Sequence, residues 1–434
     1  MEEIINEIIK KSMSLSANTE EDIIIISAVF PPEPQVSARM SWDLANYLVA
    51  QGFAVTVLCP QPSRPLNANY SKYYDKVSVV SYENNIKVVR LSSFTSPESR
   101  MLPRMWESIS FGVEVVKYIS VQNPKPALLY VNSWPLFSQI MIAGLARKNA
   151  VPIVLQVMDI YPETLTNKLP VYIRPVVYTP LKWLDNWIAR SATTVAVISE
   201  NTRYSYSKTR GINIDNVVTI PTWQDEAAFI NIPPRSECCR KYGISQDPFT
   251  FLFLGNIGPI AGVDFLIRAF TEAGINNSQL LIVGDGSAKS ECVKLVNELN
   301  LKTVHFVSDP DVTNVPVLQG MANVCVLPMK KGASMSSIPS KFPSYLFSSK
   351  PVIATVDHAS DTAACIRQAE CGWVGDAENL VWLAKTMRDV SEMSLDQLET
   401  IGQRGKKFGL TQFSKSSGVV KLAETVMQAA SVSV

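Results

Sequence analysis

The sequence is poor in the residues that build metal sites and disulfide frameworks. Its 434 residues include two histidines, His305 and His358, and an odd number of cysteines, seven, with no C-x-x-C pair among them. Most of the cysteines lie in apolar or helical surroundings, so we expect reduced thiols and a cytoplasmic protein. Cys238 and Cys239 are adjacent, but no histidine or second cysteine pair accompanies them, which favours a helix start over a zinc site.

An excess of charge of either sign is also missing. The 40 Lys and Arg residues against 39 Asp and Glu residues give a net charge of +1, which provides no global reason to expect nucleic acid as a partner. Apolar residues make up 47% and charged residues 18%, as is typical of a folded, soluble protein. Because the chain is too long for one ordinary core, we expect two domains.

No stretch of the sequence predicts a membrane span. Residues 126–146 carry no charge and are long enough to cross a bilayer. Polar residues and a proline nevertheless divide this stretch into a short strand, a turn and a helix: Asn132, Ser133, Pro135, Ser138 and Gln139. The N-terminal extension, residues 1–22, lacks the continuous apolar core of a signal peptide. Its isoleucines at positions 4, 5, 8 and 9 fall on one helical face, as in an amphipathic segment.

Several motifs of common enzyme classes are absent. No G-x-S-x-G elbow occurs, which argues against a Ser-His-Asp hydrolase. After Gly284 and Gly286, Lys289 stands where the dinucleotide fingerprint needs a third glycine, which argues against a dehydrogenase. The pair Asp309-x-Asp311 encloses a proline, and we interpret it as solvated loop carboxylates rather than metal ligands.

The sequence does contain a repeated order of strand, loop and helix. Its apolar runs are continuous rather than alternating, which indicates parallel sheets buried on both faces. A polar region with prolines, residues 221–248, separates two such series. We therefore predict an α/β fold of two Rossmann-like, doubly wound domains facing a central cleft. The expected divisions are residues 23–225, residues 226–410 and a C-terminal helix, residues 411–434, that packs back on the first domain.

Glycines follow two strands of the second series, where open α/β sheets bind ligands. Gly255, Asn256 and Gly258 lie between a strand and a helix, and Gly284-Asp285-Gly286 occupies the same kind of position. Glycine lets backbone N–H groups approach an anion, and a helix N-terminus adds partial positive charge. For the first loop, phosphate binding and a plain turn are equal alternatives; for Asp285 a plain turn is favoured.

A single lysine stands out in MKKGASMSSIPSKF, residues 329–342. Lys341 is the only charged residue between Lys331 and Lys350. The serines before it can cap the following helix, and the lysine adds a point charge for phosphate. Beside the glycine loop, this stretch favours an anion site over an exposed lysine on a capped helix.

Polar residues also follow strands of the first series. Residues 31–39, which include Ser37 and Arg39, lie where the first strand meets the first helix. Asp159 and Glu163 follow a later apolar strand and are candidates for holding hydroxyls or for base catalysis. A helix N-cap is the alternative for Asp159.

Basic and aromatic residues are mixed in residues 170–192, PVYIRPVVYTPLKWLDNWIARSA. This composition suits a membrane surface, with which the N-terminal isoleucines could assist. A core-packed amphipathic helix is the alternative, and the sequence favours it slightly.

An ordered set of stretches resembles the group 1 (family 4) glycosyltransferases of GT-B fold, and in particular their bacterial polysaccharide and O-antigen branch. These stretches run from about residue 23 over nearly the whole chain: FPPEPQVSARMSWDLANYLVAQGFAVTVLCP, VPIVLQVMDIYPETL, VAVISENTRYSYSKTRG with IPTWQDEAAF, GNIGPIAGVDFLIRAF, LLIVGDGS and SSIPSKFPSYLFSSKPVIATVD.

The resemblance implies transfer of a sugar from a nucleotide donor, usually a UDP-sugar, with retention of configuration and without a bound metal or other cofactor. The donor would lie against the second domain, with the base held in the loop after VHFVS. The residues expected on the donor are Gly255, Asn256, Gly258, Gly284, Asp285, Gly286, Ser336, Ile338, Pro339, Ser340 and Lys341. The acceptor, a saccharide or lipid-linked saccharide, would lie near Ser37, Arg39 and Asp159 at the inner face of the cytoplasmic membrane.

Three departures from the family pattern are visible. Ser336 and Ser344 stand where many members carry two glutamates, no basic residue follows GNIGPIAG before Arg268, and YVNSWPL replaces a segment that often holds a histidine. The catalytic candidates are therefore Lys341 on the leaving diphosphate and Asp159 on the acceptor hydroxyl, with Asp159 or Glu163 as the base if configuration is inverted. A sugar-nucleotide epimerase of the same architecture and a non-catalytic sugar-nucleotide binder are the alternatives.

Overall fold

The computed structural model describes residues 22–64, 70, 73, 77–96, 101–132, 136–166, 169–170, 172–309, 311–335 and 338–431. The chain forms two compact units, one made of residues up to Thr222 together with those from Val419 onwards, the other of Trp223–Gly418. The predicted α/β class with two Rossmann-like units is confirmed. The proposed N-terminal helix of isoleucines lies outside the described residues.

The first unit is built on an eight-stranded sheet in the order β3-β4-β2-β1-β5-β6-β7-β8, parallel except for the pairing of β3 with β4. Its central strand reads DIIIIS, and all four isoleucines are fully buried, as β-branched side chains in a strand covered on both faces. The strands are β1 (Asp22–Ser27), β2 (Ala54–Pro60), β3 (Val79–Glu83), β4 (Ile86–Leu91), β5 (Leu128–Asn132), β6 (Ile153–Val157), β7 (Thr194–Val197) and β8 (Val217–Thr219).

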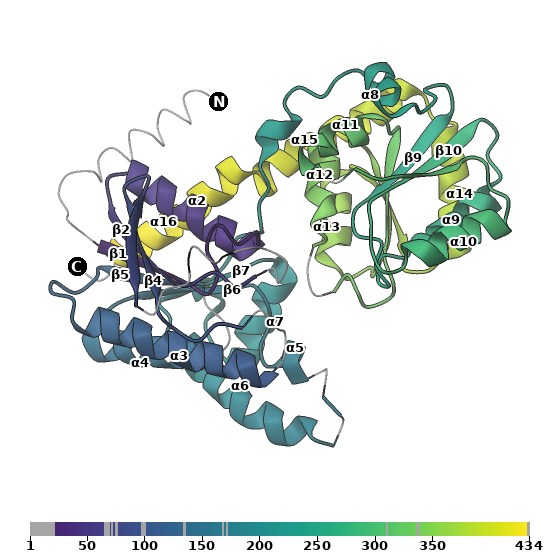
Figure 1. Ribbon diagram of the computed structural model, residues 1–434. Helices are drawn as coiled ribbons and strands as arrows, with labels where there is room; N and C mark the ends of the chain where they lie inside the picture. The colour runs from purple at the N-terminus through teal and green to yellow at the C-terminus, as the bar shows by residue number, and fades with distance from the viewer. Residues whose placement is uncertain are drawn as a thin grey trace. The chain divides into compact units, whose positions relative to one another are not determined.

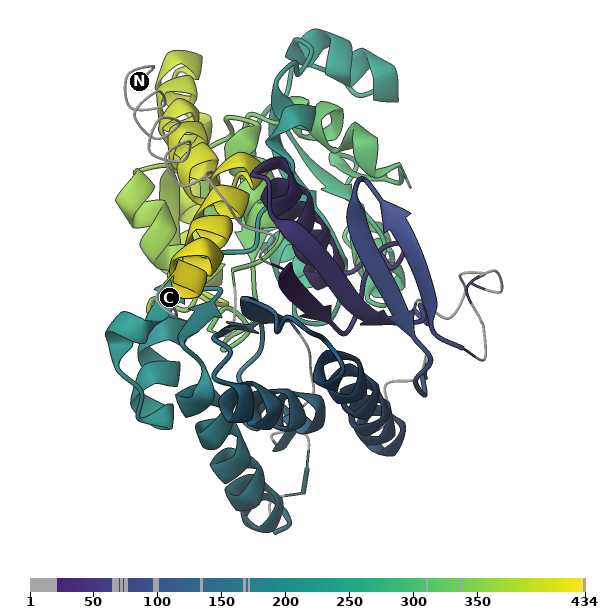
Figure 2. The same ribbon diagram turned by 90° about the vertical axis from the view of Figure 1, so that its left-hand side faces the viewer.

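Helices cover both faces of this sheet. Figures 1 and 2 show α2 and α16 side by side on one face, and Figure 1 shows α3, α4 and α6 on the other. The helices are α2 (Val36–Ala50), α3 (Met101–Ser120), α4 (Leu136–Asn149), α5 (Glu163–Thr166), α6 (Arg174–Ser191), α7 (Glu200–Arg210) and α16 (Lys415–Ser431). Within the described residues, no helix is both long and apolar enough to cross a bilayer.

The second unit is a six-stranded, all-parallel sheet in the order β11-β10-β9-β12-β13-β14. Its strands are β9 (Phe249–Leu254), β10 (Ser278–Val283), β11 (Val304–Val307), β12 (Val324–Pro328), β13 (Val352–Val356) and β14 (Gly372–Asp376). Its helices are α8 (Arg235–Tyr242), α9 (Val263–Ala273), α10 (Lys289–Glu298), α11 (Val315–Gly320), α12 (Lys341–Phe347), α13 (Asp361–Ala369), α14 (Leu380–Ser391) and α15 (Leu395–Gln412). Cys238 and Cys239 lie buried within α8, and all seven cysteines are free.

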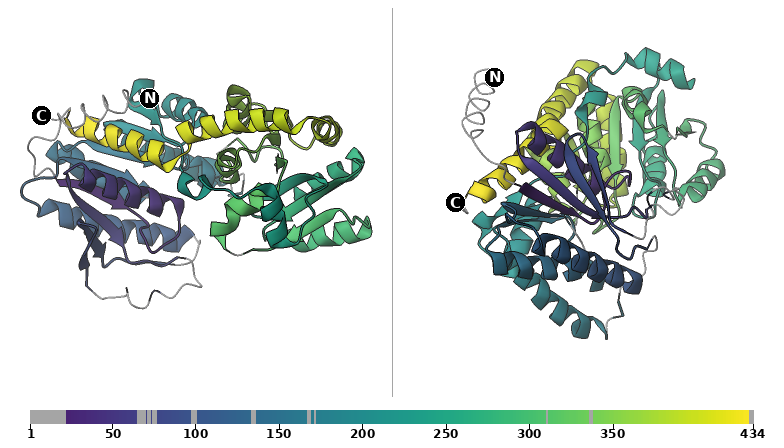
Figure 3. Two further views of the ribbon diagram at one scale, coloured as in Figure 1. Left: turned by 90° about the horizontal axis from the view of Figure 1, so that it is seen from above. Right: turned by 60° about the vertical axis from the view of Figure 1, so that its left-hand side comes forward.

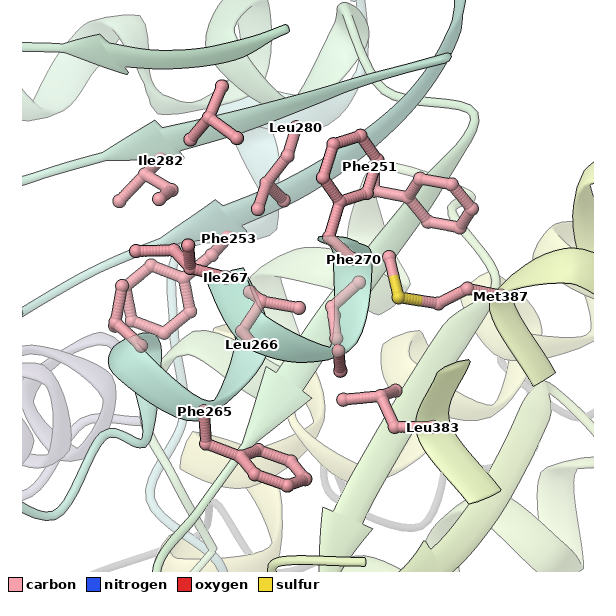
Figure 4. Packing of buried hydrophobic residues seen from close by; sticks show 14 of the residues in the cluster. Phe251, Phe253, Phe265, Leu266, Ile267, Phe270, Leu280, Ile282, Leu383 and Met387 are labelled. Atoms are coloured by element: carbon pink, nitrogen blue, oxygen red, sulfur yellow. The ribbon is translucent and has the colours of Figure 1, made fainter. Parts of the chain in front are cut away.

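Alternate side chains of β9 enter two separate cores, as the period of a strand requires. Phe251 and Phe253 pack against α9 and α14 (Figure 4), where they meet Phe270 and Met387. Leu252, between them, enters the core formed with α8, α11, α12 and α13. Because β9 has large apolar side chains buried on both faces, its position is fixed. The start of the loop that follows Leu254 is therefore fixed as well.

A buried ion network joins three elements of the first unit. Arg210, at the end of α7, is fully buried and donates to Asp185 of α6 over 2.5 Å and to both carboxylate oxygens of Glu163 over 2.8 Å. Its guanidinium also donates to the carbonyl of Tyr161. The loop after β6 is thereby tied to α6 and α7.

We expect the substitution Arg210→Met to destabilise the first unit by about 3–5 kcal/mol, because Asp185 would remain as a buried charge without its partner. Urea denaturation followed by circular dichroism measures this. Lys117→Met, which removes an exposed pair with Glu114, serves as the control and should change the free energy of unfolding by less than about 1 kcal/mol. Equal effects of the two substitutions would contradict this prediction.

Candidate functional site

The strand order of the second unit reverses between β9 and β12, which is where open α/β sheets bind ligands. β9 pairs with β10 along its whole length but with β12 only at Phe251 and Leu252. The carboxyl halves of β9 and β12 are therefore not paired with each other. Tyr345 of α12 lies beside the end of β9. Its hydroxyl accepts from the N–H of Leu254 over 2.9 Å and donates to the carbonyl of Leu254 over 3.2 Å. α12 is therefore joined directly to the strand end.

The two predicted glycine loops pack against each other at this edge. The N–H of Ile257 donates to the carbonyl of Asp285 over 2.8 Å. A Cβ on Gly284 would lie 2.1 Å from the carbonyl oxygen of Gly255, and one on Gly286 would lie 2.4 Å from that of Ile257. Gly255, Gly284 and Gly286 also have φ values of +145°, +137° and +153°, which side-chain-bearing residues rarely adopt. Glycine is therefore required at these three positions.

Lys341, the first residue of α12, lies on the first of these loops. Its Cε and Nζ would be 3.0 and 3.2 Å from a Cβ placed on Gly255, and Nζ lies 3.9 Å from the ring centroid of Phe253. Burial lowers the pKa of Lys341 to about 8. Among the described residues no carboxylate pairs with this ammonium. A mostly buried cation that lies between a glycine and a ring face is one that an anionic ligand would stabilise.

The residues just before Lys341 differ from the prediction in one respect. Ser340 stands at the N-cap position of α12, but its side chain makes no capping hydrogen bond and its backbone is helical. Its carbonyl accepts from the side chain of Gln224. Ile338 and Pro339 are partly exposed beside it, and Ser336 lies outside the described residues.

Ser344, which replaces one of the expected glutamates, does not contribute to an open surface. It is buried, donates to the carbonyl of Lys341 over 2.7 Å and accepts from the side-chain amide of Gln319 over 2.8 Å. Ser348 donates to the same amide. The sequence analysis did not identify Gln319, which lies in α11. The signal for it was the pair Ser344 and Ser348, two serines four residues apart on an apolar helix, which need a buried polar partner. These bonds hold α12, and with it the backbone of Lys341, against α11.

The loop between β12 and α12 carries a second cation that sequence reasoning did not assign. The N–H of Lys330 donates to Ile260, in the glycine loop, and its ammonium pairs with Asp264 over 3.5 Å and Glu378 over 3.4 Å. The loop GNIGPIAG itself contains no basic residue, and Lys330 supplies a basic side chain next to it. Its charge, unlike that of Lys341, is already neutralised.

Asp357, which follows β13, also fixes the loop between β12 and α12. The sequence analysis did not identify this residue either. Its carboxylate accepts from the N–H of Gly332 and, over 2.7 Å, from the hydroxyl of Ser334. Although its partial burial alone would raise the pKa of Asp357, these hydrogen bonds lower it below the ordinary value. The carboxylate is therefore ionised and anchors the segment that leads to Lys341.

Three further carboxylates of the second unit, Asp285, Asp309 and Asp311, take part in local loop geometry. Asp285 is exposed and accepts from the N–H of Gly286, as expected for a turn. Asp309 accepts from the hydroxyl of Tyr242 over 2.6 Å, and Asp311 accepts from the N–H of Thr313. Over the ranges that the structure describes, no three His, Cys, Asp or Glu residues form a group suited to a metal ion.

In the first unit the two candidate carboxylates have different environments. Glu163 is bonded to Arg210 and Lys182; although its burial alone would raise its pKa, these partners lower the pKa of Glu163 to about 2. A carboxylate with so low a pKa is a poor general base, which favours a structural role for Glu163, and its role as a base stays a prediction. Asp159 is exposed in the loop after β6 and has no hydrogen-bond or ion-pair partner in the described part of the chain.

The other expected acceptor residues lie in the first turn of α2. Arg39 is exposed, and the carbonyl of Ser37 accepts from the side chain of Asn132 over 3.1 Å. Asn132, at the end of β5, also donates to Ser41. Through these two hydrogen bonds Asn132 fixes the start of α2.

Comparison with known proteins agrees with this arrangement. Residues 37–227 match the model of Glycosyltransferase Family 4, and residues 235–408 match that of Glycosyl transferases group 1. The probable glycosyltransferase WbjE of Pseudomonas aeruginosa is 21% identical over 69% of this chain and 74% of its own length. The putative colanic acid biosynthesis glycosyl transferase WcaI of Escherichia coli is 22% identical over 75% and 80%.

The fold has counterparts among solved structures. HepE of Anabaena in complex with UDP-glucose superimposes with a TM-score of 0.63 at 16% identity, over 94% of this chain and 99% of that one. Such a likeness establishes the fold, which is GT-B. From the two family models, which together span most of the sequence, the chain belongs to the group 1 (family 4) glycosyltransferases.

Proposed function

We propose that the protein transfers a sugar from a nucleotide-sugar donor, of the UDP-sugar class, to a saccharide or lipid-linked saccharide acceptor in surface polysaccharide synthesis. The acceptor class is supported by the relative WcaI, whose name refers to colanic acid biosynthesis. The donor class is supported by HepE, which binds UDP-glucose.

The observation that carries this proposal is the ammonium of Lys341, which lies on the backbone of Gly255 and has no carboxylate partner in the described part of the chain. A nucleoside diphosphate brings negative charge and many acceptor oxygens, which suit a lysine ammonium that lies on a glycine loop at the end of a strand. The position at the reversal of strand order is the one at which such sheets bind nucleotides.

Lys341 would neutralise the diphosphate as it leaves the sugar, which lowers the barrier most if the charge is already in place. No resident metal is part of the proposal, because this lysine supplies the positive charge on the leaving group. Attack by the acceptor hydroxyl from the face that the diphosphate leaves would then retain the anomeric configuration. Asp159, an exposed carboxylate in the loop after β6, would orient that hydroxyl.

Lys341→Met should lower turnover by about 10²-fold or more, on the scale of a lost electrostatic donor, without unfolding the protein. Release of UDP from a panel of UDP-sugars with a lipid-linked acceptor measures this. The control is Lys302→Met, an exposed lysine just before β11 at the opposite edge of the sheet. Near-normal turnover of the Lys341 variant would refute the role of this residue.

The affinity for UDP should depend on pH through Lys341. Because the ammonium is charged below its pKa of about 8, UDP should bind with nearly constant affinity up to about pH 7. Binding of the diphosphate raises that pKa, so above pH 8 the affinity should fall, at most about tenfold per pH unit. Isothermal titration calorimetry from pH 6.5 to 9.5 tests this. The same decline in Lys341→Met would show that another group is responsible.

Asp159→Asn should affect turnover, whereas Glu163→Gln should affect stability. The first should reduce turnover by about 10²-fold while leaving UDP affinity and the unfolding midpoint unchanged. The second should lower the unfolding midpoint, because Arg210 loses a charged partner. Kinetics and thermal unfolding of both variants separate the roles, and unchanged turnover of Asp159→Asn would eliminate it as the acceptor residue.

A further inference from the structure

A small cavity of the second unit, about 200 Å³ in volume, is lined by basic residues. Its wall is formed by the segment that leads into α8, the end of α11, the turn before β13 and α15, and we call it the α8–α15 cavity. Figure 1 shows α8, α11 and α15 as neighbours, and Figure 3 gives two further views of the second unit. Three basic side chains line the cavity, and no acidic residue is among the described residues of its wall: Arg235, Lys350 and Lys406.

The α8–α15 cavity lies at the amino-terminal edge of the sheet. Lys350 precedes β13, and Gly320, which also lines the cavity, precedes β12. Arg235 donates to the carbonyl of Pro248, the residue before β9, over 2.9 Å. The glycine loops and Lys341 instead follow the carboxyl ends of the strands. Because a strand of five or six residues spans roughly 16–20 Å, the cavity is separate from the proposed donor site.

The basic side chains of the cavity are hydrogen-bonded, but their charges are not neutralised. Arg235 donates to the carbonyl of Met321 over 2.9 Å, and Lys350 donates to that of Ala322 over 2.7 Å. A carbonyl oxygen satisfies an N–H group without removing the positive charge. Over the ranges that the structure describes, no carboxylate forms an ion pair with Arg235, Lys350 or Lys406.

The electrostatic environment of these cations favours an added negative charge. Burial lowers the pKa of Lys350, and repulsion by Arg235 lowers it further. Burial also lowers the pKa of Arg235, although the charge of Asp247 acts on it in the opposite direction. Asp247 and Glu237, an exposed residue in the first turn of α8, both lie outside the wall of the cavity. An anion in the cavity would stabilise the charged forms of both basic groups.

The start of α8 adds to this positive field. Pro233 and Arg235, on either side of the N-cap residue Pro234, line the cavity. Proline offers no side-chain acceptor, so no side chain caps this end of the helix. The first N–H groups of a helix without such a cap carry partial positive charge, which favours an anion beside them.

The size and the lining of the cavity indicate the class of ligand. Its volume of about 200 Å³ equals about seven water molecules in the liquid and is below the roughly 300–1,000 Å³ of sites for larger ligands. A nucleotide is therefore too large, whereas a phosphate group fits. Lysine and arginine bind phosphate oxygens through charge-assisted hydrogen bonds. The apolar residues Ile230, Ile232 and Pro233 on the same wall can contact a small organic part.

We propose that the α8–α15 cavity binds a phosphate group, either as inorganic phosphate or as the phosphoryl end of a small phosphorylated metabolite. One anion would join α8, the turn before β13 and α15, so its binding stabilises the second unit. The site is distinct from the proposed donor site and does not rest on the proposed function.

Isothermal titration calorimetry of the full chain with inorganic phosphate, in chloride buffer of constant ionic strength, tests the site. Lys341→Met is titrated as well, which separates the cavity from phosphate bound beside the glycine loops. Lys406→Met should lower the phosphate affinity at least about tenfold, because a charge-assisted hydrogen bond is lost. Lys407→Met is the matched control, since Lys407 is exposed on the same helix and does not line the cavity.

A second pair of variants changes the charge of the cavity without removing a cation. Ser349, in its wall, has a φ of +55°, a conformation that Asn and Asp adopt more readily than most residues with side chains. Ser349→Asp should abolish phosphate binding, because its carboxylate neutralises the basic side chains. Ser349→Asn has the same shape without the charge, so it should bind phosphate and unfold at a lower midpoint than Ser349→Asp.

The outcomes separate the cavity from the proposed donor site. A phosphate site that persists in Lys341→Met and is weakened in Lys406→Met supports the proposal. Tighter binding of glycerol 3-phosphate than of inorganic phosphate would assign the cavity to a phosphorylated metabolite, and equal or weaker binding to free phosphate. Absence of binding to Lys341→Met, or equal affinity of Lys406→Met and Lys407→Met, would overturn the proposal, while UDP binding would still support the proposed function. Phosphate binding without UDP binding would overturn the proposed function alone.

Discussion

The loops after β9 and β10 share space that neither could occupy if it carried side chains. The carbonyl oxygen of Gly255 lies where a Cβ of Gly284 would be, and that of Ile257 lies where a Cβ of Gly286 would be. As a result, the two loops can lie in contact, and Lys341 packs on Gly255 with its ammonium over Phe253. The environment of the lysine, and therefore the proposed anion site, depends on this close packing.

Two different uses of buried charge organise the two units. In the first, Arg210 satisfies Asp185 and Glu163, which fixes the loop after β6 and at the same time anchors α6. Asp159, in the same loop, has no hydrogen-bond or ion-pair partner among the residues that the structure describes. In the second unit the ammonium of Lys341 has no carboxylate partner among the described residues. Paired charge builds structure here, and unpaired charge marks the places suited to chemistry.

The grouping of the glycine loops with Lys341 was predictable, because each follows a strand and the carboxyl ends of parallel strands share one edge. The roles of other polar residues were not. Ser344 occupies a position suggestive of donor contact, yet its hydroxyl is used by Gln319, 25 residues away in sequence. Ser340 precedes a helix as capping residues do, but its backbone is helical and its side chain does not cap. Asp357 and Lys330 belong to the loop's support only because distant segments meet there.

By itself the sequence determined the α/β class with two Rossmann-like units and the strand-end position of the glycine loops, because continuous apolar runs and glycine positions are local properties that packing does not reverse. Only the tertiary structure decided which carboxylate is unpaired and which half of α6 is buried. Glu163 and Asp159 look alike in sequence, and the difference between them is Arg210, 47 residues beyond Glu163. Side-chain charge and exposure depend on partners that the fold brings together, and no local pattern records those partners.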